Sequence, residues 1–183
     1  MMKHLNIEII FVKLAKDGFY DGLLFHRVIK EFMIQGGDPD SKNAKPDQML
    51  GSGGLDYRID AEFNKDLIHQ KGALAAARDN NPDKASSSCQ FYIVAGKKFT
   101  EKEVENFSKR TGAVYTPEQV KIYEEIGGTP HLDNGYTVFG QVTKGLDIVD
   151  KIQAVATNKQ DRPTQDVHIK KVKVKKKFLF FWI

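Results

Sequence analysis

Two spacings of apolar residues run through this sequence, and each predicts a different kind of element. Residues 5–17 carry apolar side chains at spacings of three and four from Ile7 to Leu14, which is typical of a helix with one buried face. Gly18 follows directly and predicts the end of this helix. A similar pattern at 146–153 predicts a second, shorter helix.

Short apolar runs predict strands, and several of them are rich in β-branched and aromatic residues. They cover residues 23–29, 32–36, 71–78, 89–95, 136–142 and 167–175. Lys30 and Glu31 form a tight connection between the first two runs. In the last run the apolar residues move from odd to even positions at Lys170–Lys171, which predicts a bulge. Polar segments at 36–58 and 80–88 predict loops.

Residues 100–128 contain two helix-start signatures, each a threonine followed three residues later by glutamate or glutamine. Thr100 and Glu103 form the first pair, and Thr116 and Gln119 form the second. Glycines follow each predicted helix, so we expect a helical hairpin inserted between two strands. Because strands and helices do not alternate strictly, an antiparallel barrel or sandwich is expected rather than a doubly wound sheet.

The size of the chain, 183 residues with 40% hydrophobic composition, predicts a single domain covering 1–183 with one sizeable core. The net charge of +4 depends on six lysines between positions 170 and 177, so the basicity belongs to the tail 170–183. We favour an edge strand whose lysines prevent association with other strands. Contact with phosphate or an acidic membrane surface is the alternative. The sequence leaves open whether the ending FLFFWI packs on the domain or is foreign to it.

Cellular location is addressed by two features of the sequence. No apolar run approaches the ~18 residues that a membrane span requires. The single cysteine, Cys89, excludes an internal disulfide framework and fits a reducing compartment. We therefore expect a cytoplasmic location, unless a signal sequence precedes Met1.

Among the candidates for chemistry, Arg27 stands out. The five histidines show no ligand spacing, so no metal site is expected. The GSGG at 51–54 lacks the lysine of a phosphate-binding loop. Arg27, in contrast, has the apolar neighbours Phe25, Val28 and Ile29. It either extends to water with its stem along these neighbours or has a function in an apolar pocket, and spacing alone favours neither.

The segment around Arg27 resembles a family signature. FHRVIKEFMIQGGD at 25–38 is similar to the signature of the cyclophilin-type peptidyl-prolyl cis-trans isomerases. Four further segments agree in order: GALAAAR at 72–78, SSSCQFYIV at 86–94, HLDNGYTVFGQV at 131–142 and GLDIVDKI at 145–152. The resemblance covers about residues 11–175 and implies a mainly β fold, a closed eight-stranded antiparallel barrel with two capping helices. The hairpin 100–128 would be an insertion in this fold.

The resemblance also implies roles for individual residues. Arg27 matches the catalytic arginine, and Gln35 matches a polar group beside it that orients the substrate. The matches on the substrate-binding surface are the proline pocket Phe32, Met33, Tyr92 and Leu132, the polar Gln90, the groove residues Ala77 and Arg78, and the rim residues His131 and Tyr136. A plain two-residue turn at Lys30–Glu31 would place Gln35 opposite His26, so its position beside Arg27 comes from the resemblance.

The function that the resemblance implies is rotation about X-Pro peptide bonds, which assists protein folding. No bond breaks in this reaction, so no cofactor and no metal are expected. The implied partners are proline-containing polypeptides, bound by a monomer, and no nucleic acid is expected. Cyclosporin is expected to bind weakly, because His131 stands where the family often has a tryptophan.

The start of the sequence departs from the family pattern. Cyclophilins normally have a β-hairpin before the helix that is predicted here at 5–17. We therefore expect a barrel that is incomplete at its N-terminus and lacks two strands. This departure keeps a second interpretation open, in which the chain is a non-catalytic proline-peptide-binding module or an inactive truncated fragment.

Overall fold

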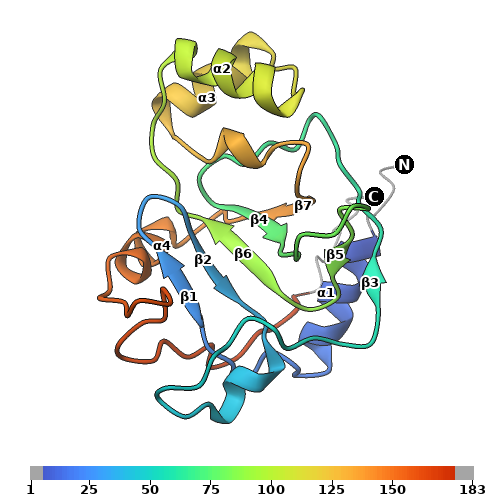
Figure 1. The fold of residues 1–183 in the computed structure, drawn as a ribbon, viewed down its shortest axis with the longest axis vertical. Helices are drawn as coiled ribbons and strands as arrows, with labels where there is room; N and C mark the ends of the chain where they lie inside the picture. Colours follow the sequence, from blue (N-terminus) through green and yellow to red (C-terminus); the bar gives the residue numbers. More distant parts are fainter. Residues whose placement is uncertain (1–5, 176–183) are drawn as a thin grey trace, which may run out of the picture.

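One antiparallel sheet of five short strands forms the centre of the computed structural model, which describes residues 6–175 (Figure 1). In spatial order its strands are β1 (Arg27–Ile29), β2 (Met33–Gly36), β6 (Phe91–Val94), β4 (Ala73–Ala76) and β7 (Val138–Gln141). A separate pair joins β3 (Arg58–Ile59) to β5 (Ser86–Ser87), at segments where loops were predicted. The five strands of the sheet all lie within predicted runs but are shorter than predicted, and the mainly β, antiparallel fold class is confirmed.

Alternate residues of the strands face opposite sides of the sheet, as the pleat requires. Met33 of β2 and Tyr92 of β6 belong to a buried cluster on one face. Ile34 and Phe91, their chain neighbours, belong to clusters on the other face. The sheet is therefore apolar on both sides, which explains why its strands read as continuous apolar runs.

Two helices cover the face that carries Ile34 and Phe91. They are α1 (Asn6–Lys16) and α4 (Leu146–Gln153). Phe11 of α1 meets Phe91 edge to face, with ring centroids 5.4 Å apart. Val149 of α4 packs with Ile34. Both predicted helices are confirmed, and they leave the opposite face of the sheet available for a binding site.

The turn between β1 and β2 sets the register of the sheet edge. Arg27 pairs with Gln35, and Ile29 pairs with Met33, so three residues form the loop. Glu31 in this loop has a φ of 59°, a left-handed conformation that closes the tight turn. The two-residue turn with Gln35 opposite His26 is therefore wrong, and the register implied by the resemblance is confirmed.

The predicted last strand, 167–175, is only partly formed. The backbone amide of Ile169 donates to Leu23 O at 2.7 Å, and the only bridge within this segment pairs His168 with Leu24. Beyond Ile169 the backbone leaves the ladder, because the amide of Val172 donates to the carboxylate of Asp21 instead. Ile169 and Val172 both pack on the core, so the inward-facing positions change from odd to even here. The predicted bulge is not formed, because residues 167–175 contain one isolated bridge and no continuous strand. Residues 176–183, with the FLFFWI ending, lie outside the described residues.

The predicted helical hairpin is present between β6 and β7. It consists of α2 (Glu101–Thr111) and α3 (Pro117–Glu125), and a short 3-10 helix, η2 (Pro130–Leu132), follows it. Figure 1 shows the hairpin standing apart from the strands at the top of the view. Both capping boxes form as predicted, with Thr100 and Thr116 as N-caps. The hairpin packs its own small core around Val104 and Tyr123 against Ile68.

Gly128 provides a test of how the hairpin rejoins the sheet. Its backbone bridges both Gln70 and Lys97, and a Cβ atom there would overlap the carbonyl oxygen of His69. Gly128→Ala is therefore expected to lower the free energy of unfolding by about 1–3 kcal/mol, measured by urea denaturation. Gly54→Ala is the control, because no atom lies within 4 Å of the added carbon. Equal stability of the two variants would contradict this account.

Candidate active site

A cavity of about 290 Å³ lies on the face of the sheet opposite α1 and α4. Nine of the eleven predicted site residues line it: Arg27, Phe32, Met33, Gln35, Ala77, Arg78, Tyr92, Leu132 and Tyr136. His26 and the segment Leu50–Ser52 complete the lining. The residues come from β1, β2, β6, the end of β4 and η2, so the cavity depends on the register of the whole sheet.

The floor of the cavity is apolar. Met33, Tyr92 and Leu132 are buried in one cluster, and Phe32 packs against it from the side. Tyr136 meets Tyr92 edge to face, with ring centroids 5.9 Å apart. A small apolar ring could pack on the surface that these side chains form. The assignment as a proline pocket stays a prediction.

Arg27 lies in the wall of this cavity. Its side chain is 43% exposed, and its Nε donates to the carboxylate of Asp161 at 3.3 Å. Asp161 thus contacts the guanidinium from one side and leaves its other N–H groups available to a ligand. Asp161 was not among the predicted site residues. No spacing signal links two residues that are 134 positions apart.

The two predicted glutamines act as a pair. Gln35 lies opposite Arg27 in the β-ladder, and its amide donates to the Gln90 oxygen at 3.0 Å. The Gln90 amide in turn donates to the carbonyls of Gly51 and Gly53, at 2.9 and 2.7 Å. Gln90 lines an adjoining groove of about 390 Å³ rather than the cavity itself. Its place in the structure is therefore behind Gln35, which it orients.

The rim is built from Arg78, Tyr136 and His131. Arg78 places its guanidinium carbon 4.5 Å from the centre of the Tyr136 ring and donates to Gly135 O at 2.8 Å. His131 does not line the cavity. His131 is exposed as a residue, and its ring lies 5.4 Å from the Phe32 ring and 5.9 Å from the Phe107 ring.

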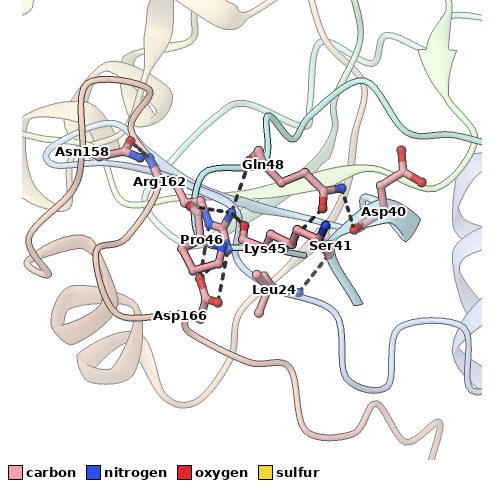
Figure 2. Close-up of polar contacts among 9 residues, drawn as sticks. All are labelled: Leu24, Asp40, Ser41, Lys45, Pro46, Gln48, Asn158, Arg162 and Asp166. Atoms are coloured by element: carbon pink, nitrogen blue, oxygen red, sulfur yellow. Dashed lines mark hydrogen bonds and ion pairs between the residues drawn. The ribbon is translucent and has the colours of Figure 1, made fainter. Parts of the chain in front are cut away.

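A buried arginine holds the loop that leads into the Leu50–Ser52 part of the cavity lining. Arg162 donates through Nη1 to the carbonyls of Lys45, Pro46 and Gln48, at 2.7, 3.2 and 3.2 Å (Figure 2). Its Nε and Nη2 bind the carboxylate of Asp166. A guanidinium can satisfy this many acceptors because it presents five donors in one plane.

This contact matters for the site because the held loop continues into Leu50–Ser52, which form one wall of the cavity. Asp161 holds Arg27, and its chain neighbour Arg162 holds the loop. One short segment after α4 therefore positions two walls of the cavity at once. No sequence motif pointed to this segment.

His26 adds a neutral group beside Arg27. Burial lowers its pKa to about 4; the charges of Arg27 and Arg162 act in the same direction, while Asp38 opposes them. The imidazole is therefore uncharged at neutral pH and does not weaken the field of the guanidinium.

Metal ligation and membrane insertion find no support in residues 6–175. They contain no group of three or more His, Cys, Asp or Glu side chains placed to hold a metal ion. No helix in the same range is long and apolar enough to cross a membrane. Cys89 is buried in the core cluster beneath α1.

The geometry agrees with the comparison to known proteins. The sequence model of the family described as cyclophilin type peptidyl-prolyl cis-trans isomerase/CLD matches residues 9–174. This chain belongs to the cyclophilin-type peptidyl-prolyl cis-trans isomerases. The family predicted from the segment around Arg27 is thereby confirmed.

Two curated relatives show how far the similarity extends. A putative bifunctional phosphatase/peptidyl-prolyl cis-trans isomerase of Streptococcus pyogenes is 40% identical over 168 residues, which cover 90% of this chain and 33% of that protein. A putative peptidyl-prolyl cis-trans isomerase of Staphylococcus saprophyticus is 35% identical over 164 residues, with 90% and 78% covered. The chain thus spans a third of the first relative and most of the second.

A solved structure supports the fold. The cyclophilin type isomerase of Cryptosporidium parvum, crystallised in the presence of the dipeptide Ala-Pro, superposes with a TM-score of 0.64. The alignment covers 92% of this chain and 84% of that one, at 22% sequence identity.

The buried His26 predicts a pH dependence of stability. The unfolded chain takes up a proton near pH 6.5 and the folded chain only near pH 4, so the unfolded state holds more protons between these values. The free energy of unfolding is therefore expected to fall as the pH drops through this window, by about 2 kcal/mol at pH 5 relative to pH 7. Urea denaturation at the two pH values measures the loss. His26→Gln cannot titrate and should lose less, and an equal loss in both proteins would speak against this assignment.

Proposed function

We propose that this cyclophilin isomerises X-Pro bonds with the proline ring on the apolar floor and the Arg27 guanidinium directed at the prolyl nitrogen. The observation that carries the proposal is a single cavity that joins the floor of Met33, Tyr92 and Leu132 to a guanidinium fixed by Asp161.

The reaction explains why an arginine serves here. Rotation about a peptide bond meets a barrier of ~18–20 kcal/mol, because the planar amide is stabilised by resonance. In the twisted state that resonance is lost, and the prolyl nitrogen becomes pyramidal and accepts a hydrogen bond. A donor aimed at this nitrogen stabilises the twisted state more than either planar form, which is what catalysis requires. Arg27 keeps its proton at every relevant pH, so it is always a donor.

The remaining residues would hold the substrate for this rotation. Gln35, oriented by Gln90, is placed to bind the substrate backbone next to Arg27. Ala77 and Arg78 line both the cavity and the adjoining groove, so the peptide would pass over them. With its ring fixed on the floor, the proline stays in place while the carbonyl before it turns.

The wider setting follows from the same assignment. The substrates would be proline-containing polypeptides, and the reaction would assist their folding. We propose that the chain acts as a monomer in the cytoplasm, in keeping with its single buried cysteine. The division into one domain of residues 1–183 with an insertion at 100–128 and a tail at 170–183 stays a prediction.

Arg27→Ala tests the proposed catalytic role. We expect kcat/KM on a short Ala-Pro peptide, measured in a protease-coupled assay, to fall by roughly two to three orders of magnitude, as when one transition-state donor is removed. Arg27→Lys keeps the charge but loses the planar fork and should recover only part of the rate. Arg110→Ala, on the exposed side of α2, is the control for a lost positive charge. Equal rates for wild type and Arg27→Ala would refute the role, and saturable peptide binding without turnover would favour a binding module.

His131 predicts weak inhibition by cyclosporin. An imidazole offers less apolar surface than an indole, and here it lies outside the cavity wall against Phe32. His131→Trp is therefore expected to lower the inhibition constant by roughly tenfold, with little change in the uninhibited rate. The same peptide assay with increasing inhibitor measures both values. Inhibition that is equally strong in wild type and variant would contradict the assignment.

A further inference from the structure

A chain of hydrogen bonds leads from the floor of the cavity to the inserted helical hairpin. The Tyr92 hydroxyl, in the floor, lies 2.9 Å from His69 Nε2. His69 Nδ1 lies 2.6 Å from Asp133 Oδ1. The other carboxylate oxygen of Asp133 accepts hydrogen bonds from Tyr115, at 2.7 Å, and from Tyr123. Tyr115 and Tyr123 belong to the hairpin and do not line the cavity.

Four of the five members of this chain are shielded from water, and Tyr115 is partly buried. His69 is 1% exposed, Tyr123 is fully buried, and Tyr92 and Asp133 are nearly so. In such surroundings a polar group that loses its partner is not rescued by solvent. Each member therefore depends on the next for its position.

The directions of the hydrogen bonds follow from Asp133. A carboxylate only accepts, so Tyr115 and Tyr123 donate to it, and His69 carries a proton on Nδ1. The backbone amide of His69 adds a fourth donor at 2.9 Å. In the neutral ring, Nε2 is then free to accept from the Tyr92 hydroxyl, which fixes the direction of that phenol. A tyrosine held in this way cannot turn its hydroxyl toward the bound ring.

The hairpin also holds the wall next to this floor. Leu132, which lines the cavity, directly precedes Asp133. The Tyr115 hydroxyl lies 3.1 Å from the carbonyl of Pro130, the first residue of η2. Both tyrosines thus hold Asp133, and Tyr115, in the loop between α2 and α3, also lies beside η2. Through Asp133 they reach Tyr92 and the neighbouring Leu132.

We propose that Tyr115 and Tyr123 of the inserted hairpin are positioning residues for the proline pocket, acting through Asp133 and His69 on Tyr92. The inference rests on the proposed function, since it assumes that the proline ring binds on the Tyr92 floor. Neither tyrosine touches the substrate. The hairpin thereby shapes the pocket from outside it, and a change in the hairpin alters substrate affinity.

Tyr123→Phe tests this inference, since it removes one hydroxyl and keeps the ring. The floor holds the proline in planar and twisted states alike, so its disturbance weakens both. We expect KM for the Ala-Pro peptide to rise roughly tenfold with little change in kcat, in contrast to Arg27→Ala. Tyr20→Phe is the matched control. Tyr20 is 1% exposed, and its hydroxyl donates to Cys89 O, away from this network. Both variants should melt at a lower temperature than wild type, but only Tyr123→Phe should change KM.

Two further measurements separate positioning from general stability. In the pair Tyr92→Phe and Tyr123→Phe, the double variant should be no worse than the more affected single one, because both changes break one chain. The NMR signals of the Tyr92 ring should move in Tyr123→Phe and stay in Tyr20→Phe. If Tyr123→Phe does not fold, Tyr115→Phe, whose side chain is only partly buried, carries the same test.

The outcomes distinguish this inference from the proposed function. Suppose that Arg27→Ala loses activity, but that the hairpin variants keep the wild-type KM and the wild-type Tyr92 signals. This result would overturn the inference and leave the proposed function standing. The inference would also be overturned if the increases in KM from Tyr92→Phe and Tyr123→Phe added up in the double variant. An inactive wild type would overturn the proposed function, and the Tyr92 signals would then still decide whether the hairpin positions the floor.

Discussion

The pleat of β2 and β6 is the constraint on which the site depends. Ile34 and Phe91 point to one face of the sheet and enter the core beneath α1 and α4. Met33 and Tyr92, their chain neighbours, point to the other face and form the floor of the cavity. A slip of one residue would exchange the two sets and bury Gln35. The three-residue turn at Glu31 prevents this slip, because its left-handed conformation fixes which residues of β1 and β2 are paired. Stability of the core and placement of the site are therefore decided by the same register.

A charged group beside an apolar floor needs support that the floor itself cannot give. Arg27 would gain from extending into water, and Asp161 offsets that tendency by holding Nε at the cavity wall. Arg162, next in the chain, holds the loop that leads to Leu50–Ser52 in the cavity lining. Because both anchors lie on one segment, the position of this segment affects both Arg27 and that part of the lining.

The sequence predicted those features that depend on residues close together in the chain, and it did not predict those that depend on distant residues. The capping boxes at Thr100 and Thr116 and the helical spacing before Gly18 involve residues a few positions apart, and these elements were predicted with nearly correct ends. The site residues came from resemblance, and nine of the eleven line one cavity. Asp161, the His69–Asp133 pair and the incomplete last strand were missed. Each depends on partners more than sixty positions away, where no periodicity carries information.

The buried carboxylate of Asp133 shows why the hairpin and the pocket belong together. An ionised group without solvent is tolerated only when its acceptor sites are filled, and four donors surround this one. Two of the four come from the hairpin and two from His69. Without the two tyrosine hydroxyls, Asp133 would lose two of its four hydrogen-bond donors in a buried environment. The carboxylate would then be expected to turn toward solvent, where water can replace them. That turn would release His69, and with it the only partner of the Tyr92 hydroxyl among the contacts of residues 6–175. The orientation of Tyr92 in the floor of this pocket therefore depends on the hairpin, or on another source of hydrogen-bond donors to Asp133.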